Sequence, residues 1–215
     1  MHYTNRYDAA LKLIPLLEKY QNKNAVLLAV PRGGVPIGYY IAKKLNFPMD
    51  LLLTKKIGHP LNSEVAIGAV SLEDEIVDVY PYISYEYVNN EIKEIREKLK
   101  QRFKKFMGNR KPIDLENKIV IIVDDGIATG NTLLAAIQMV QNKSPKKIVV
   151  AVPVAPIDSA EKIRNSVDEF ICPYITDDFI GVGGYYFDFS QVRDEEVIKL
   201  MNEINRIQNK TAITP

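Results

Sequence analysis

The sequence predicts an α/β domain with a doubly wound, mostly parallel sheet and helices on both faces. Short apolar runs, such as residues 25–30 and 120–123, alternate with stretches of helical periodicity. Apolar runs without polar alternation are typical of strands that are covered on both faces, as in parallel sheets. Glycine-rich turns follow both runs. Since ligands of such sheets bind beyond the carboxyl ends of the strands, we expect these turns to share one edge.

Length and composition indicate a single domain over residues 1–215 and argue against several classes of protein. The chain has 28 basic and 27 acidic residues, a net charge of +1, which argues against a general nucleic-acid-binding protein. The single cysteine, Cys172, excludes an internal disulfide framework and suits the reducing cytosol. Residues 1–20 carry charges throughout, so we expect neither a signal peptide nor a membrane span, and a cytoplasmic location.

The first elements are a helix, a strand, a turn and a second helix. Residues 8–20 have helical spacing, and Pro15 is expected to kink or divide that helix. The apolar strand at 25–30 ends in Pro31-Arg32-Gly33-Gly34. A helix is expected from about Val35 to Leu45, with Pro36 in its first turn. Taken alone, this strand–turn–helix unit is equally consistent with an ordinary βα connection.

The next segment predicts three strands and a polar loop. Residues 49–57 form an apolar strand that ends in Lys55 and Lys56. Shorter strands are expected at 66–71 and 75–80, joined by a charged turn. The stretch GHPLNSE, residues 58–64, follows the two lysines and precedes the shorter strands. It is expected to be a mobile loop, because it is polar and contains proline and glycine.

A long helix is expected at 84–107, where apolar residues recur every three or four positions. Ser84 is placed to cap it, and Gly108 to end it. The basic run at 100–111 is interpreted as a solvated helix end, with an anion-binding edge as the alternative.

The second half continues the alternation of strands and helices. Helices are expected at 132–142, 159–166 and from 194 to about 208, and strands at 146–156 and 169–174. The aromatic and glycine-rich segment 177–192 has two interpretations. Its rings could stack on a planar ligand, or they could be core or dimer contacts.

The central motif joins two kinds of chemistry. The strand 120–123 is followed at once by Asp124 and Asp125, and adjacent carboxylates are costly to bury without partners. Small residues over 126–132 leave backbone N–H groups to converge on an anion at a helix N-terminus. A phosphorylated sugar satisfies both halves. A P-loop is excluded because Asn131 replaces its lysine, and a helix-capping turn of a generic α/β protein is the plain alternative.

The motif VIIVDDGIATGNT, residues 120–132, resembles the phosphoribosyl-diphosphate (PRPP) signature of type I phosphoribosyltransferases. The similarity extends to PRGG, to TKKIGHPLNSEVAIGAV and to GYYFDFSQVRDEEV, and so covers most of the chain. These stretches together resemble a bacterial and archaeal branch of predicted phosphoribosyltransferases. The expected architecture is therefore that fold, with a small hood from about 1–20 and 177–192, and a β-hairpin lid.

The resemblance implies a role for each part of the site. Asp124 and Asp125 match the pair that holds the ribose hydroxyls and supports catalysis. The implied 5-phosphate loop consists of Gly126, Ile127, Ala128, Thr129, Gly130, Asn131 and Thr132. The implied pyrophosphate site consists of Arg32, Gly33 and Gly34, often with a strained non-proline peptide bond, and of Lys55 or Lys56.

The implied lid is the loop 58–64, with more of the following hairpin, and the hood covers the base. The relatives that act on 6-oxopurines have an aspartate for the base proton at the position of Ala128, so the loop offers no general base. His59 and Glu64 in the lid are the candidates. The lid histidine could equally be a polar loop residue or a phosphate contact.

The implied activity is Mg²⁺-dependent transfer of phosphoribose from PRPP to an unidentified nitrogenous base, with release of pyrophosphate, in nucleotide metabolism. Mg²⁺ is expected to be held mainly by PRPP, near the acid pair and without defined side-chain ligands. A homodimer is expected. The alternative is a regulator that senses PRPP and binds nucleic acid or protein. The PRGG turn, the lysines and the lid favour the enzyme, and the chain is too short for a PRPP-forming kinase.

Overall fold

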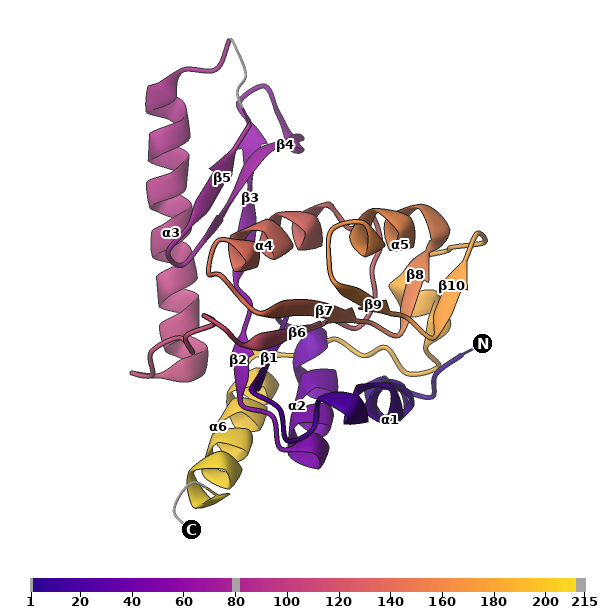
Figure 1. Ribbon diagram of the computed structural model, residues 1–215. Helices are drawn as coiled ribbons and strands as arrows, with labels where there is room; N and C mark the ends of the chain where they lie inside the picture. Colours follow the sequence, from indigo (N-terminus) through magenta and orange to yellow (C-terminus); the bar gives the residue numbers. More distant parts are fainter. Residues whose placement is uncertain (1, 79–81, 212–215) are drawn as a thin grey trace.

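The computed structural model describes residues 2–78 and 82–211 and is built on a five-stranded parallel sheet (Figure 1). The order of the strands is β2-β1-β6-β7-β9. They span Ala25–Ala29 (β1), Met49–Leu51 (β2), Ile119–Val123 (β6), Lys147–Ala151 (β7) and Glu169–Ile171 (β9). The predicted doubly wound sheet is confirmed.

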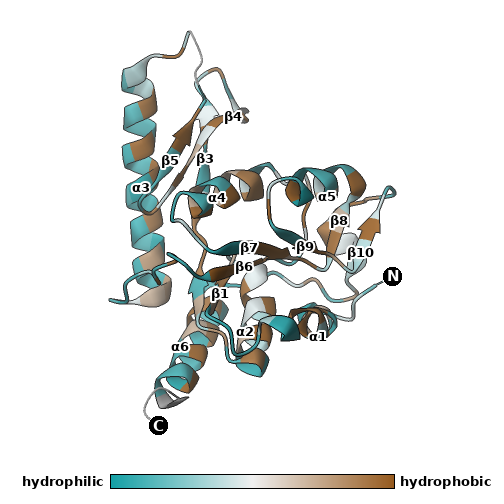
Figure 2. Cartoon of the chain, in the orientation of Figure 1, coloured by the Kyte–Doolittle hydropathy of each residue, from teal (hydrophilic) through white to brown (hydrophobic). Residues whose placement is uncertain are grey.

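Helices cover both faces of this sheet, and the period of two along each strand decides which face a residue meets. In β1, Val26 and Leu28 pack in the core under α4 and α5, whereas Leu27 and Ala29 pack in the core with α1, α2 and α6. Figure 2 shows the hydrophobic colouring concentrated on the central strands. The helices span Arg6–Leu17 (α1), Gly34–Leu45 (α2), Asn131–Gln141 (α4), Ile157–Arg164 (α5) and Asp194–Thr211 (α6).

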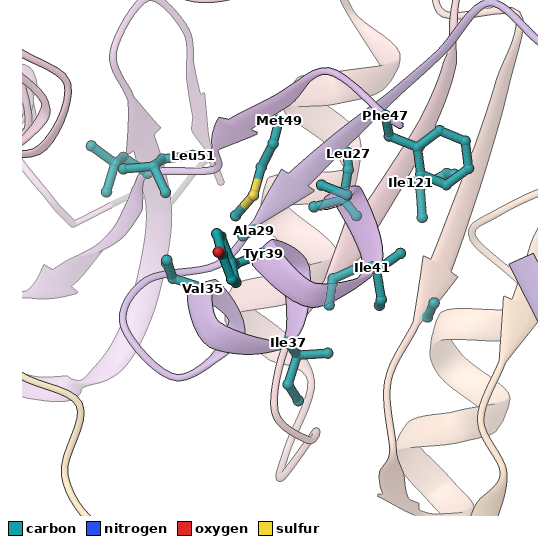
Figure 3. Close-up of a cluster of buried hydrophobic side chains, with 14 of the residues drawn as sticks. Leu27, Ala29, Val35, Ile37, Tyr39, Ile41, Phe47, Met49, Leu51 and Ile121 are labelled. Carbon is teal, nitrogen blue, oxygen red and sulfur yellow. The ribbon is translucent and has the colours of Figure 1, made fainter. Parts of the chain in front are cut away.

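The packing of α2 on the sheet fixes the turn that precedes it. Val35, Ile37 and Ile41 of α2 are fully buried, and they lie near Leu27 and Met49 in the cluster of Figure 3. Pro36 stands in the first turn of the helix, as expected, where the absence of its N–H costs no helical hydrogen bond. The turn 31–34 is therefore held between a buried strand and a buried helix.

Pro15 did not divide α1, although the sequence analysis expected a kink or a division there. The helix α1 continues through Pro15 to Leu17, before a short 3₁₀ turn, η1 (Glu18–Tyr20), so the predicted division is wrong. The carbonyl that Pro15 leaves without a helical partner belongs to Leu11, a residue that is 44% exposed.

The predicted strands 146–156 and 169–174 are each split in two. The second parts, β8 (Val154–Pro156) and β10 (Tyr174–Thr176), form a separate parallel pair. Pro153 and Pro173 stand at the two breaks, and proline cannot donate to a sheet ladder. A 3₁₀ turn, η2 (Val182–Tyr185), follows this pair.

The predicted strand 49–57 also divides between two sheets. After β2 the chain leaves the parallel sheet and enters β3 (Thr54–His59), which pairs antiparallel with β4 (Asn62–Ser71). The third strand of this sheet is β5 (Glu75–Val77). Residues 79 and 80 of its expected range lie outside the described residues.

The expected loop at 58–64 is wrong, because only Pro60 and Leu61 lie between the two strands. Gly58 and His59 pair with Ala66 and Asn62 across an irregular register, so part of the main chain of this stretch is paired, and its polar side chains can project into water. Polarity alone therefore did not distinguish a loop from an exposed hairpin.

The long helix α3 (Tyr85–Met107) is confirmed, and it flanks the hairpin sheet opposite α4 (Figure 1). Ser84 Oγ accepts from the Tyr87 N–H at 3.2 Å, and the Gly108 N–H donates to the Lys104 carbonyl. The Tyr87 hydroxyl also donates to the Gly58 carbonyl at 2.9 Å, so α3 holds the hairpin near its tip. In the described part of the chain, no helix is both long and apolar enough to cross a membrane.

Candidate active site

The acid pair and the PRGG turn lie side by side because their strands are neighbours. Ala29 at the end of β1 pairs with Val123 at the end of β6. Two glycines make the close approach possible. A Cβ atom on Gly33 would lie 1.9 Å from Asp125 Oδ2, and one on Gly34 would lie 2.6 Å from the Val123 carbonyl oxygen. The peptide bond between Pro31 and Arg32 is cis.

The loop 126–132 encloses a cavity at the N-terminus of α4. Gly130 caps that helix with φ +75°, a left-handed conformation that favours glycine. The loop is fixed from outside, since Ser159 Oγ donates to the Ala128 carbonyl at 2.6 Å and the Ile127 N–H donates to the Val154 carbonyl. The lining of this cavity consists of Asp124, Gly126, Ile127, Ala128, Thr129, Gly130, Thr132 and Leu133.

The size of this cavity matches one group of a ligand. Its volume is about 170 Å³, whereas pockets for whole small molecules measure roughly 300–1,000 Å³. The helix N-terminus offers unpaired backbone N–H groups and a partial positive charge, which favour an anion. The cavity therefore has the size and polarity for a phosphate group, with the Asp124 carboxylate at its edge.

The two acids have different partners. Asp125 Oδ2 accepts from Nε and Nη2 of Arg6, at 2.9 and 2.8 Å. Asp124 Oδ1 accepts from the Asp125 N–H at 2.8 Å. Burial raises the pKa of Asp124 well above its usual range, and the charge of Asp125 raises it further. Burial also raises the pKa of Asp125, although Arg6 partly offsets this effect. The expectation that the pair would need partners is met on one side by an arginine.

Arg6 is the site residue that the sequence did not reveal. It stands in the first turn of the first helix, 119 positions from the acid that it contacts, and it belongs to no recognisable motif. No local pattern distinguishes it from the other basic residues of the chain. Only the folded arrangement of α1 over the sheet edge brings it to Asp125.

The predicted pyrophosphate residues are placed around the same edge. Arg32 Nη1 lies 3.3 Å from Asp194 Oδ1, and Lys105 Nζ lies 2.7 Å from Asp194 Oδ2. Lys105 comes from the basic run at the end of α3, so part of that run reaches the turn. Lys56 lines a second cavity, of about 290 Å³, between the hairpin and the phosphate loop. Lys55, which precedes Lys56 and points to the opposite side of the strand, is exposed and does not line this cavity.

The second cavity brings the hairpin and the loop together. On the loop side it is bordered by Thr129, Asn131 and Thr132, and on the hairpin side by Lys56 and small residues of β4. The hairpin therefore faces the phosphate loop directly. Residues of the hairpin and of the loop 126–132 thus border one cavity.

The N-terminal residues and the aromatic segment form one unit over the acid pair. The Tyr3 N–H donates to the Tyr185 carbonyl at 2.7 Å, and the Phe187 N–H donates to the Tyr3 carbonyl at 2.9 Å. Tyr185 and Tyr186 are buried, whereas Phe187 is 80% exposed. Both tyrosines of this segment are therefore core residues.

Comparison with known protein families matches residues 8–190 to the phosphoribosyl transferase domain. This range includes the acid pair, the phosphate loop and the PRGG turn. The chain belongs to the phosphoribosyl transferase family. Its fold and the resemblance seen in the sequence agree with this membership.

Relatives of the family match over most of the chain. A Mycobacterium tuberculosis protein with the provisional name phosphoribosyl transferase is 35% identical over 210 residues, which are 95% of this chain and 47% of that protein. The chain thus spans about half the length of these curated relatives. The crystal structure of TT1426 from Thermus thermophilus is 32% identical, with a TM-score of 0.85, covering 94% of this chain and 99% of the other.

A shorter match involves a named enzyme of the phosphoribosyl transferase family. The uracil phosphoribosyltransferase of Mycoplasma genitalium is 41% identical over 63 residues, which are 28% of this chain and 31% of that protein. This match is local, so it supports membership in the family and leaves the acceptor of this chain open.

Of the two predicted lid residues, the structure describes the side chain of His59 but not that of Glu64. His59 ends β3, its Nδ1 accepts from the Leu61 N–H at 3.1 Å, and it lines neither cavity beside the phosphate loop. Glu64 belongs to β4, but its side chain lies outside what the structure describes. The general base therefore stays unassigned.

Among the described residues, no three or more His, Cys, Asp or Glu side chains gather as a metal cluster. The acid at the edge of the phosphate cavity is Asp124. A site with one carboxylate fits Mg²⁺, which keeps several waters and binds through one or two carboxylates together with substrate phosphates.

Proposed function

We propose that this chain transfers the 5-phosphoribosyl group from PRPP to a nitrogenous base and releases pyrophosphate. One observation carries the proposal. Asp124 and the loop 126–132 border the same cavity at a helix N-terminus, beside the turn 31–34. A carboxylate for sugar hydroxyls, an anion site for the 5-phosphate and an adjacent basic turn match the three parts of PRPP.

The charges of the site suit departure of pyrophosphate from C1. The leaving group carries several negative charges, and Arg32 and Lys56 supply cations on two sides of the loop. Cleavage builds positive charge on the sugar ring, as in glycoside hydrolysis. The carboxylate of Asp124 stabilises that charge electrostatically, since it is fixed by the Asp125 N–H and stands in partly buried surroundings.

Mg²⁺ would be held chiefly by the oxygens of PRPP, with Asp124 as the nearby carboxylate, and it would neutralise the leaving group. The hairpin β3–β4 has the position of a lid, because its Lys56 side faces the phosphate loop. A lid over this cavity would exclude water, which otherwise attacks the sugar cation.

The test is release of pyrophosphate from Mg²⁺–PRPP by the purified protein, with a panel of purines, pyrimidines and related amides. We expect release that depends on one class of acceptor. Tight binding of PRPP without release for any acceptor would point to the sensor instead. Failure to bind PRPP at all would mean that the central motif has another role.

A further inference from the structure

We propose that the two acids have separate tasks. Asp124 faces the sugar, while Asp125 is held by Arg6, which positions an N-terminal arm (residues 3–6) and the segment 186–190 over the site. Arg6 is thus a positioning residue, and the acid pair is not a symmetric clamp on the ribose. The kinetic test of this inference rests on the proposed function. The ordering of the arm can also be measured without turnover.

The carboxylate of Asp125 is enclosed on two sides. Both Nε and Nη2 of Arg6 donate to one oxygen, Oδ2, and the two side chains are only 12% and 14% exposed. On the other side the same oxygen occupies the space where a Cβ of Gly33 would stand. The side chain of Asp125 is therefore packed between an arginine and a glycine, and Asp125 does not line the phosphate cavity.

Arg6 connects this acid to the arm and the segment. Its third nitrogen, Nη1, donates to the Ser190 carbonyl at 2.8 Å, and its guanidinium lies 4.1 Å from the centre of the Phe189 ring. The Tyr186 hydroxyl adds a second link, since it donates to the Asp125 carbonyl at 2.6 Å. One guanidinium thereby joins the sheet edge to a segment more than 60 residues away in sequence.

The arm moves with this segment because their backbones are paired. The N–H groups of Phe187 and Asp188 donate to the carbonyls of Tyr3 and Thr4, both at 2.9 Å. Loss of the Arg6 contact would therefore loosen both the arm and the segment 186–190.

Arg6 also borders a further cavity, of about 180 Å³. Its walls include Asn5, Tyr7 and Tyr40, and the two tyrosine rings meet edge to face at 4.6 Å between centroids. Arg6 borders this cavity but not the phosphate cavity. Its loss should therefore alter the geometry of the acceptor and of the acid pair, and leave the binding of the 5-phosphate intact.

The kinetic test compares Arg6→Gln, Arg6→Lys and Asp125→Asn with Lys12→Gln as a matched control. Lys12 is an exposed cation on the same helix. We expect Arg6→Gln to lower kcat/KM for the acceptor about 100-fold, the effect of a misplaced reacting group, with little change in the KM for PRPP. Arg6→Lys should recover part of the loss, because lysine keeps the charge but lacks the planar fork.

The double variant Arg6→Gln with Asp125→Asn decides whether the two residues act as a unit. We expect it to be no worse than either single variant, since each removes the same contact. Additive losses, or wild-type kinetics in Arg6→Gln, would overturn the inference.

Hydrogen exchange gives the test that does not require turnover. The amides of Tyr3, Phe187 and Asp188 make the bonds of the arm, and they should exchange faster in Arg6→Gln and Asp125→Asn than in Lys12→Gln. Unchanged exchange would overturn the positioning role even in a protein without activity. If the wild type releases no pyrophosphate but the variants still exchange faster, the proposed function is refuted. The positioning role of the contact between Arg6 and Asp125 would then still stand.

Discussion

The two ends of the central sheet both hold buried or half-buried carboxylates, and they treat them in opposite ways. At the amino end, Glu169 accepts from the Tyr20 hydroxyl and from the ammonium groups of Lys19 and Lys147. Burial by itself would raise the pKa of Glu169, but these hydrogen bonds outweigh it and lower the pKa to about 2. The charge there is fully matched by the chain itself.

At the carboxyl end, the charge of Asp124 is not matched in this way. Burial and the adjacent Asp125 both raise the pKa of Asp124, and Asp125 has already engaged Arg6. A carboxylate that the chain leaves poorly compensated beside a cavity is a mark of a functional site. The difference teaches that the amino end contributes stability, whereas the carboxyl end leaves one carboxylate poorly compensated, at a cost in stability.

The largest expected effect comes from Asp124→Asn, which removes the poorly compensated charge. Turnover should fall about 1,000-fold, the scale for loss of one preorganised electrostatic group. The folded protein should at the same time become more stable above the raised pKa of Asp124, because an ionised group in costly surroundings is there replaced by a neutral one. Pyrophosphate release and thermal unfolding of the same samples measure the two effects.

The pH dependence of stability checks the sign of this prediction. Since the folded-state pKa of Asp124 is raised, the folded protein binds more protons than the unfolded chain between the usual and the raised pKa. Wild-type stability should therefore fall as pH rises through that interval, and the Asn variant should lose this part of the slope. Lower stability of the variant across the whole range would show that Asp124 is compensated after all.

Gly33→Ala should have the next largest effect, because it acts on the acid pair through packing. The new Cβ would stand 1.9 Å from Asp125 Oδ2 and would displace the carboxylate. We expect a loss of activity of about 100-fold and about 1–3 kcal/mol of stability. Gly108→Ala is the control. Gly108 has φ +66°, and a Cβ atom there would meet no other atom within 4 Å. Its substitution should therefore lower stability and leave activity unchanged.

The sequence predicted those features of the fold that neighbouring residues encode, and it missed those that depend on residues far apart in the chain. The parallel sheet, α2, α3 and the turn that opens α4 were predicted because each is encoded by neighbouring residues, and the phosphate-binding role of that turn stays a prediction. Continuous apolar runs did not show where a strand changes sheets, as at Leu52 and Leu53, which are buried beyond β2. Prolines between the runs, Pro153 and Pro173, were the available signal for two of the three breaks.

The site was predicted only in its local parts. The motif 124–132 identified the acids and the loop, but Arg6 and Asp194 reach the site from distant elements, and no spacing in the sequence connects them. Polar composition at 58–64 suggested a loop where the chain forms a hairpin. Long-range contacts of charged side chains depend on packing of whole layers, so a single sequence does not reveal them.

Glu169→Gln tests the other side of the comparison. It should cost about 1 kcal/mol of stability, the usual contribution of a hydrogen-bonded, partly exposed ion pair, with unchanged kinetics. Because the folded-state pKa of Glu169 is lowered to about 2, its contribution is present above the usual carboxyl pKa and is lost as pH falls toward 2. Wild type and variant should thus converge in acid. A change in kcat at neutral pH would contradict the assignment of this end to structure.

The smallest expected effect belongs to Asp194→Asn, which sharpens the comparison within the carboxyl end. Asp194 pairs with Arg32 and Lys105 at 3.3 and 2.7 Å, in partly exposed surroundings. Such pairs contribute about 0.2–1 kcal/mol, so stability should change little. If Arg32 binds pyrophosphate as proposed, Asp194 competes with it, so the KM for PRPP should fall by a factor of about 1.4 to 5, as the same energy range implies. A rise in that KM would show that Asp194 orients Arg32 toward the leaving group instead of holding it away.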